Sequence, residues 1–371
     1  MTNSYNTLED ASWGPAKTIA SFFKQSEAIA SVTDLFAYAE ALHEVGRLRK
    51  ALEITDLLTG RALSKASLCL VLILKSHILR ELAQPIESER ELRTACDLDV
   101  SVYPYIRLAE FQRERQRFSD SLETLSIAEN KCSNNDEDTA CAISYTRAVN
   151  FISLSRLDDA KTLLEQILHT SSRSDQIREI LIDINNALSG QLQGLESGPI
   201  SIVQIHNSSQ NKLSLSNRQS YCYADALHQI NRFDEALEEC ARLKEKLINK
   251  ISGVNAHVLV LEGRIWTSLR QYKLAEDAFR KALILDDSTV SYVYLAGALA
   301  RQECFAEAIQ VLEKALLING DTDEVLLNIA LNRRAMGQLL EAKVSLELAL
   351  LLTPDYTEAK EVLNDISAAL E

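Results

Sequence analysis

Five basic side chains in the second half of the sequence have the chemistry to bind a carboxylate group. Four are arginines, and the planar guanidinium of arginine can donate two parallel hydrogen bonds to the two oxygens of a carboxylate. The fifth is a histidine. The set consists of Arg218, His257, Arg264, Arg301 and Arg334. These residues can recognise one ligand only if the fold brings them onto one surface.

The sequence motifs that would indicate an enzyme are absent. The chain has no phosphate-binding Gly-x-x-x-x-Gly-Lys-Ser/Thr, no Gly-x-Gly-x-x-Gly turn and no Gly-x-Ser-x-Gly nucleophile elbow. His43 and Glu44 begin like a zinc-protease motif, but the second histidine ligand does not follow. The six histidines share no short spacing with one another or with a cysteine. We therefore predict a non-enzymatic protein with no catalytic residue, no metal site and no cofactor.

The composition predicts an all-α protein. Of the 371 residues, 46% are apolar and 25% are charged, with only 11 glycines and 5 prolines to interrupt helices. A formal net charge of −14 would repel the phosphates of nucleic acids and anionic lipids. We therefore expect no nucleic-acid partner.

No segment of the sequence has the features of an export signal or a membrane span. The N-terminal stretch MTNSYNTLEDASWGP carries acidic residues where a signal peptide needs basic ones, followed by no apolar core. The longest apolar run, Leu68 to Leu74, is far below the roughly 18 residues that span a bilayer. The seven cysteines are scattered and never occur in Cys-x-x-Cys spacing, as is typical of reduced thiols. These features predict a cytoplasmic protein with no direct membrane insertion.

One phrase, written bulky-x-x-small-x-x-x-bulky, recurs along the chain and is clearest at 272–287, 305–320 and 339–354. Its small residue serves as an anchor for the repeat. The anchors are Ala51, Ser88, Ser121, Ala160, Ala236, Ala275, Ala308 and Ala342. Their spacing is about 33 to 39 residues, with one step of about two periods after Ala160. Such a period is typical of helical arrays.

A second set of small residues lies twelve positions before the anchors. It comprises Ala39, Ser76, Ala109, Ala148, Ala224, Gly263, Ala296 and Ala330. Two antiparallel helices joined by a tight turn can approach closely only where one of them presents no bulk to the other. The two sets therefore predict a helical hairpin in every repeat, with the helices crossing at the small residues.

On these residues the sequence resembles a tetratricopeptide repeat (TPR) protein, over roughly three quarters of its length. The best match is the unit from Ala256 to Thr289, and Pro354 closes the last unit as in the family's pattern. The motif residues of the best unit are Gly263, Trp266, Tyr272, Ala275, Phe279 and Ala282. The resemblance implies a right-handed α-solenoid of about eight helical hairpins plus a C-terminal capping helix, interrupted near the middle.

Five segments are predicted from the repeats and from the Gly- and Ser-rich stretch between them. They are an N-terminal tail and capping helix (1–31), an N-terminal TPR array (32–174), a degenerate unit and loop (175–216), a C-terminal TPR array (217–356) and a C-terminal capping helix (357–371). In the degenerate unit we expect a helix from Ser174 to Leu188 without a regular partner, followed by a loop over 189–216.

Each capping helix is expected to bury one face. The N-terminal helix is expected to dock on the first repeat through Ile19, Phe22 and Phe23. In the C-terminal helix, the residues predicted to face inward are Val362, Leu363, Ile366 and Leu370. The residues predicted to face solvent are Glu358, Lys360, Glu361 and Asp365.

The resemblance also implies that the first helices of the hairpins line an inner groove. The fifth position of each repeat, which would face it, reads Phe36, Ile73, Ile106, Tyr145, Tyr221, Val260, Val293 and Leu327. This apolar row could seat a helix or an extended peptide of a partner. It could equally be core packing between neighbouring first helices. The lysine and asparagine with which chaperone-binding family members grip a terminal carboxylate are missing, which disfavours that role.

At the groove positions of the second half, basic residues outweigh Asp225 and Glu324. We hypothesise that this surface accepts an acidic or carboxylate-bearing segment. A solvated surface without a ligand is the alternative. The candidate partner-binding residues are Tyr145, Arg218, Tyr221, His257, Arg264, Arg301 and Arg334.

The sequence thus favours a non-catalytic scaffold or adaptor that binds a protein or peptide partner, as a separate protein or as a subunit of a larger complex. The alternative is a peptide-sensing regulatory protein whose superhelix changes its bend when a ligand binds.

Overall fold

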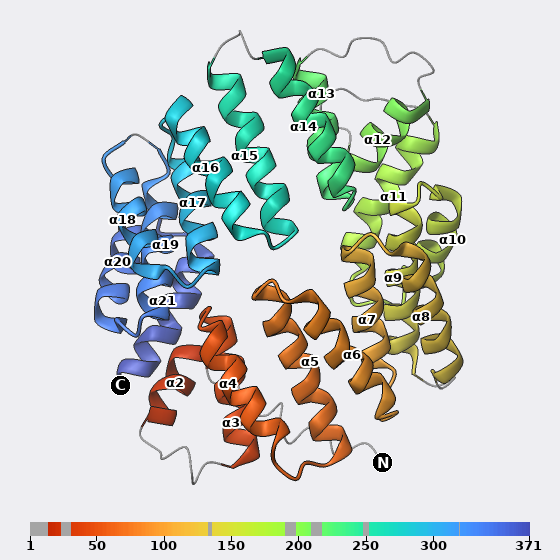
Figure 1. Ribbon diagram of the computed structural model, residues 1–371, viewed down its shortest axis with the longest axis horizontal. Coiled ribbons are helices and arrows are strands. Elements are labelled where there is room, and N and C mark those ends of the chain that lie inside the picture. The colour runs from red at the N-terminus through yellow and green to blue at the C-terminus, as the bar shows by residue number, and fades with distance from the viewer. Residues whose placement is uncertain are drawn as a thin grey trace. The chain divides into compact units, whose positions relative to one another are not determined.

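The chain is all-α, as its composition and repeats predict (Figure 1). The computed structural model describes residues 14–23, 31–132, 136–189, 198–208, 217–247, 252–318 and 320–371. Within these ranges the chain forms twenty helices and no strand.

The helices follow one another as hairpins. The pairs are α3 (Val32–Glu44) with α4 (Leu48–Thr59), α5 (Lys65–Glu81) with α6 (Pro85–Asp97), α7 (Tyr103–Glu114) with α8 (Phe118–Lys131), α9 (Glu137–Ser153) with α10 (Leu157–Ile167), α11 (Ser174–Ser189) with α12 (Pro199–Ser208), α13 (Asn217–Gln229) with α14 (Phe233–Leu247), α15 (Ser252–Ser268) with α16 (Tyr272–Leu285), α17 (Thr289–Arg301) with α18 (Phe305–Ala315), and α19 (Thr322–Ala335) with α20 (Leu339–Leu352). A helix stands before and after the hairpins, α2 (Pro15–Phe23) and α21 (Thr357–Leu370).

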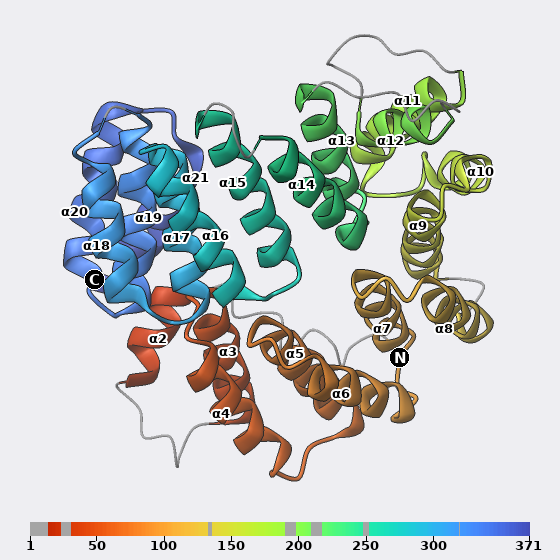
Figure 2. The same ribbon diagram turned by 45° about the horizontal axis from the view of Figure 1, so that its top comes forward.

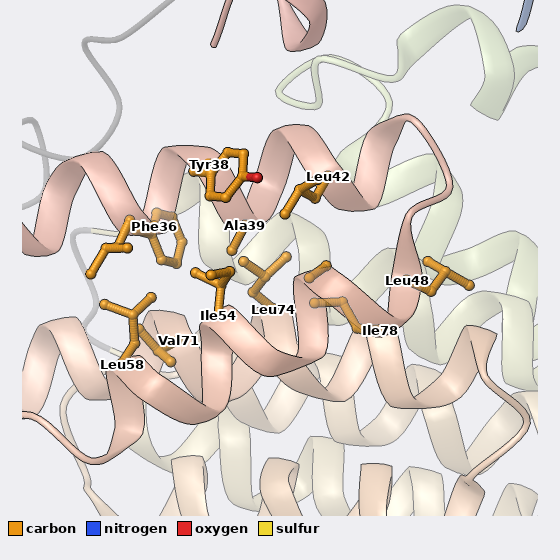
Figure 3. Close-up of a cluster of buried hydrophobic side chains, with 12 residues drawn as sticks. Phe36, Tyr38, Ala39, Leu42, Leu48, Ile54, Leu58, Val71, Leu74 and Ile78 are labelled. Atoms are coloured by element: carbon orange, nitrogen blue, oxygen red, sulfur yellow. The ribbon is translucent and has the colours of Figure 1, made fainter. Parts of the chain in front are cut away.

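The predicted crossings of small residues are confirmed. All eight anchors and all eight residues twelve positions before them are buried. In Figure 3, Ala39 of α3 lies over Ile54 of α4, with larger side chains on either side. Where the anchor is a serine, its hydroxyl also bonds the facing helix: Ser88 Oγ donates to the Ser76 carbonyl at 2.8 Å, and Ser121 Oγ to the Ala109 carbonyl at 2.7 Å.

One type of turn joins the two helices of the hairpins. Its middle residue has a positive φ, and the amides around it close the end of the first helix, as in Gly46 N to His43 O (3.0 Å) and Arg47 N to Leu42 O (2.8 Å). The residues at this position in the described turns are Gly46, Ala83, Gln116, Ser155, Asn231, Arg270, Glu303 and Gly337. Only two of them are glycine, although this backbone region is unfavourable for most other residues.

The predicted loop over 189–216 is wrong in part, because residues 199–208 form α12 and pair with α11. The Asp183 carboxylate of α11 accepts hydrogen bonds from the amides of Ile200 (3.0 Å) and Ser201 (3.2 Å) and so caps α12. A side chain at position 198 would collide with that carboxylate, so Gly198 permits the approach. Gly198 and Pro199 therefore start a helix here, although as sequence they indicate a break.

The chain divides into two compact units. One consists of Met1–Glu91 together with Ser252–Glu371, and the other of Leu92–Ile251. The first unit therefore contains both ends of the chain. The predicted division into arrays on either side of 175–216 stays a prediction.

Within the first unit, α2 packs on both α3 and α21 (Figures 1 and 2). Ile19 packs against the core of the first hairpin, as predicted. Ala16 is buried on the other side, in a cluster that includes Leu327 of α19 and Ile366 of α21. The side chains of Phe22 and Phe23 lie outside the described residues. Helix α2 thus joins the first hairpin to the C-terminal helix.

Two predictions for the C-terminal helix are wrong. Asp365 was expected to face solvent, but its side chain is 10% exposed and faces α2 and α19. Leu370 was expected to face inward but is exposed, because it is the last residue of α21. Val362 and Ile366 are buried as predicted, and Leu363 packs against the same cluster.

Candidate partner-binding surfaces

The seven candidate residues lie on the first helices of their hairpins but belong to both units. His257 and Arg264 lie on α15, Arg301 on α17 and Arg334 on α19, all in the first unit. Tyr145 of α9 and Arg218 and Tyr221 of α13 belong to the second. A single site made of all seven stays a prediction.

Arg301 binds a carboxylate from the N-terminal part of the chain. Its Nη1 lies 2.8 Å from Glu81 Oε2 of α5, which is 220 positions away in sequence. The other oxygen, Oε1, lies 3.4 Å from His43 Nε2, without the alignment of a hydrogen bond. Burial alone would raise the pKa of Glu81, but His43 and Arg301 outweigh it and hold that pKa at about 2.

Replacing Glu81 with glutamine is expected to weaken the pH dependence of stability. Because the pKa of Glu81 is lowered in the folded chain, its contribution to stability is fully present above pH 4.5 and is lost as the pH falls towards about 2. We expect a loss of about 1–3 kcal/mol near pH 7, since Arg301 is half exposed and solvent screens the pair. Urea unfolding between about pH 7 and pH 3 measures the effect. Glu44→Gln, on the exposed end of α3, is the control, and an equal effect of both variants would contradict the assignment.

Arg334 also binds a carboxylate within the chain. Its Nη1 lies 3.2 Å from Asp365 Oδ2, and both side chains are largely buried. The same oxygen accepts a hydrogen bond from the Ala16 amide at 3.3 Å, in the first turn of α2. Burial raises the pKa of Asp365, and neither the Ala16 amide nor Arg334 fully reverses this. Arg334 therefore helps to hold α2 in place.

His257 and Arg264 lie two turns apart on α15 and so share a face of that helix. His257 is exposed and Arg264 is half-buried. The corresponding stretch of α17 carries exposed Val290 and exposed Gly297, and a Cβ built on Gly297 meets nothing within 4 Å. This part of the first unit offers a basic group, an apolar group and open space.

The second-unit residues have different surroundings. The guanidinium carbon of Arg173 lies 4.9 Å from the centre of the Tyr145 ring, a cation–π contact. Arg218 is exposed, and Tyr221 is half-buried. Tyr145 is therefore already covered in part by a basic side chain.

The apolar row at the fifth repeat position is largely core. Phe36, Ile73, Ile106 and Leu327 are buried, and Val260 and Val293 pack against the cluster around Phe279. Of the two interpretations, core packing describes these six residues.

An open cavity of about 440 Å³, which no sequence pattern indicated, lies in the first unit where the first hairpin turn meets the start of α18. It is lined by Arg47, Glu303, Cys304, Phe305, Ala306, Glu307 and Met336. The Arg49 amide donates to Glu303 Oε1 at 2.9 Å beside it. No local pattern signals a contact between segments so distant in sequence.

The described residues contain no group of three or more His, Cys, Asp or Glu that could hold a metal ion. In the same part of the chain, no helix combines the length and the apolar character that a bilayer crossing needs.

No family model matches the sequence, and no curated protein matches it. Several solved structures are similar at low identity. A tetratricopeptide repeat protein from Parabacteroides merdae is 13% identical, covering 81% of this chain and 99% of that one, with a TM-score of 0.36. PilF from Pseudomonas aeruginosa is 14% identical, with 72% and 98% covered and a TM-score of 0.34. A TPR protein from Thermus thermophilus is 17% identical, with 62% and 98% covered and a TM-score of 0.34.

The repeat motif and the hairpins built on it define the class. The chain folds as an all-α, TPR-like series of helical hairpins.

Proposed function

We propose that this chain is a non-catalytic scaffold or adaptor that binds an acidic segment of another protein on α15 and α17 of the first unit. His257 and Arg264 of α15 would receive the carboxylates, and exposed Val290 of α17 would contact an apolar side chain beside them.

The contact between Arg301 and Glu81 carries this proposal. It is an example within the chain of the same recognition, in which a basic residue on a first helix binds a carboxylate from a distant segment at 2.8 Å. Arg334 and Asp365 give a second example. Arg301 and Arg334 bind internal partners, and the proposal places the external carboxylates at exposed His257 and half-buried Arg264 of α15.

Charge reversal on α15 tests the proposal. Fluorescence anisotropy would follow synthetic peptides that are identical except for acidic, neutral or basic flanks. Arg264→Glu is expected to weaken binding of the acidic peptide by about tenfold or more, because a charge-assisted hydrogen bond is replaced by repulsion. The control is Lys273→Glu, which makes the same charge change at an exposed position on α16. No binding of the acidic peptide, or equal losses in the two variants, would overturn the proposal.

One observation favours the peptide-sensing alternative: the contact of Arg301 with Glu81 at 2.8 Å joins α17 to α5. A ligand carboxylate that replaced Glu81 on Arg301 would release the contact between α5 and α17. In that case the acidic peptide would increase hydrogen exchange at the end of α5, whereas a plain scaffold would leave that exchange unchanged.

A further inference from the structure

Helix α20 carries apolar residues on its exposed side as well as on its buried side. Ala342, Leu346 and Ala349 are buried against the neighbouring helices. The opposite side carries five apolar residues whose exposed fractions lie between 48% and 77%. They are Leu340, Val344, Leu348, Leu351 and Leu352, called here the α20 strip. Their spacing of three and four places them on one face, which runs the length of the helix.

The two preceding hairpins each expose an apolar residue at the same repeat position. Ile284 is the next-to-last residue of α16 and Leu317 follows α18, each two residues after a buried alanine, as Leu351 is on α20. Their exposed fractions are 82% and 86%. Single exposed apolar residues need no explanation, but five of them along one face of α20 mark an interaction surface. In both ribbon views α20 lies at the edge of the helices around it (Figures 1 and 2).

The rim of the strip is acidic. Glu341 and Glu347 are the exposed charges of α20 itself, while its Lys343 is half-buried. On the next helix, Glu358, Lys360 and Glu361 are exposed, and Lys360 lies 3.7 Å from exposed Asp355. On the preceding helix, Arg333 Nη1 donates to Ser345 Oγ of α20 at 2.9 Å. Carboxylates therefore outnumber the basic groups around the strip. An anionic lipid surface would be repelled by this rim. In a two-fold pair of copies the same carboxylates would face one another.

We propose that the α20 strip is a second docking surface, which binds a basic amphipathic helix of another protein. The apolar stripe of that helix would pack on Val344, Leu348 and Leu351, and its flanking lysines or arginines would meet Glu341 and Glu347. This surface is separate from the one on α15 and α17, and it selects a partner of opposite charge.

The probe for the test is a synthetic helix of about 18 residues with leucines at spacings of three and four and lysines on the flanks. A second peptide carries glutamate in place of lysine. Binding of both to the full chain is measured by calorimetry. The lysine peptide is expected to bind at least about tenfold more tightly than the glutamate peptide, and high salt is expected to reduce the difference.

Two protein variants locate the binding. The double variant Leu348→Gln, Leu351→Gln is expected to bind the lysine peptide at least about tenfold more weakly. Both side chains are exposed, so we expect the variant to keep its fold. Ile182→Gln, at an exposed position on α11, is the matched control and should change nothing. Arg264→Glu should not weaken binding of the lysine peptide. Failure of this inference can therefore be distinguished from failure of the acidic-segment proposal.

Three results would overturn the inference. One is equal binding of the two peptides, and another is an affinity unchanged by the strip variant. The third is a concentration-dependent dimer of the chain that the strip variant abolishes, because a second copy would then be the occupant.

Discussion

Replacing Phe279 with alanine is expected to lower the free energy of unfolding by about 3–5 kcal/mol. The ring is 1% exposed and lies in the core between the last three hairpins. It stacks on Tyr294 of α17, with ring centres 5.5 Å apart and planes at 12°. Its removal would leave a cavity that the surrounding helices cannot fill without moving. Urea unfolding of the full chain measures the change.

The same ring determines whether a second substitution, Gly263→Ala, stabilises or destabilises the chain. A Cβ on Gly263 of α15 would lie 2.4 Å from the Phe279 ring, so Gly263→Ala forces the packed ring to shift. We expect a net loss of about 1–2 kcal/mol, because the packing strain exceeds the roughly 1 kcal/mol that alanine gains in a helix. In the Phe279→Ala background the clash is gone, and Gly263→Ala should stabilise the chain. A double-mutant cycle of four proteins shows this change of sign.

Gly297→Ala is the matched control for this cycle. Gly297 lies inside α17, as Gly263 lies inside α15, but a Cβ there meets nothing within 4 Å. Alanine should therefore stabilise α17 by about 0.5–1 kcal/mol whether or not Phe279 is present. A Gly263→Ala variant as stable as Gly297→Ala would show that the crossing does not need glycine.

The crossing of Gly263 and Phe279 also shows why so much of the fold could be predicted. Two helices of a repeat can approach only if small and bulky residues occupy fixed positions. The spacing of residues close in sequence therefore predicts how the helices pack. The hairpins follow from it, whereas the two capping helices were predicted from their own apolar residues. Helix α12 did not follow from the spacing, because a carboxylate 17 positions away, on Asp183, supplies its cap.

The candidate site was less accessible to sequence reasoning. The residue types of Arg301 and Arg334 indicated carboxylate binding, and each does bind a carboxylate of its own chain. Their partners could not be predicted, because Glu81 lies 220 positions from Arg301 and comes from the opposite part of the chain. Asp365 looked like one more solvent-facing acid on an amphipathic helix. Pairing between distant segments leaves no periodic trace in a sequence.

Replacing Asp365 with alanine is expected to cost about 3 kcal/mol near pH 7. The change leaves the Arg334 guanidinium, whose Nε already lacks a hydrogen-bond partner among the described atoms, buried without its carboxylate. It also removes the acceptor of the Ala16 amide. Helix α2 should therefore lose its protection against hydrogen exchange before the hairpins unfold. Glu361→Ala, at an exposed position on the same helix, is the control.

Two further measurements separate the lost ion pair from a general loss of packing. Adding Arg334→Met to Asp365→Ala should restore most of the stability, because no unpaired charge is then buried. The pH dependence should also run opposite to that of Glu81. Since burial raises the pKa of Asp365 above 3.8, the contribution of this carboxyl to stability is greatest at low pH and is lost as the pH rises through its folded pKa. The titration of this carboxyl should therefore make Asp365→Ala cost more free energy of unfolding in acid than at neutral pH. A double variant no more stable than Asp365→Ala alone would contradict the ion-pair explanation.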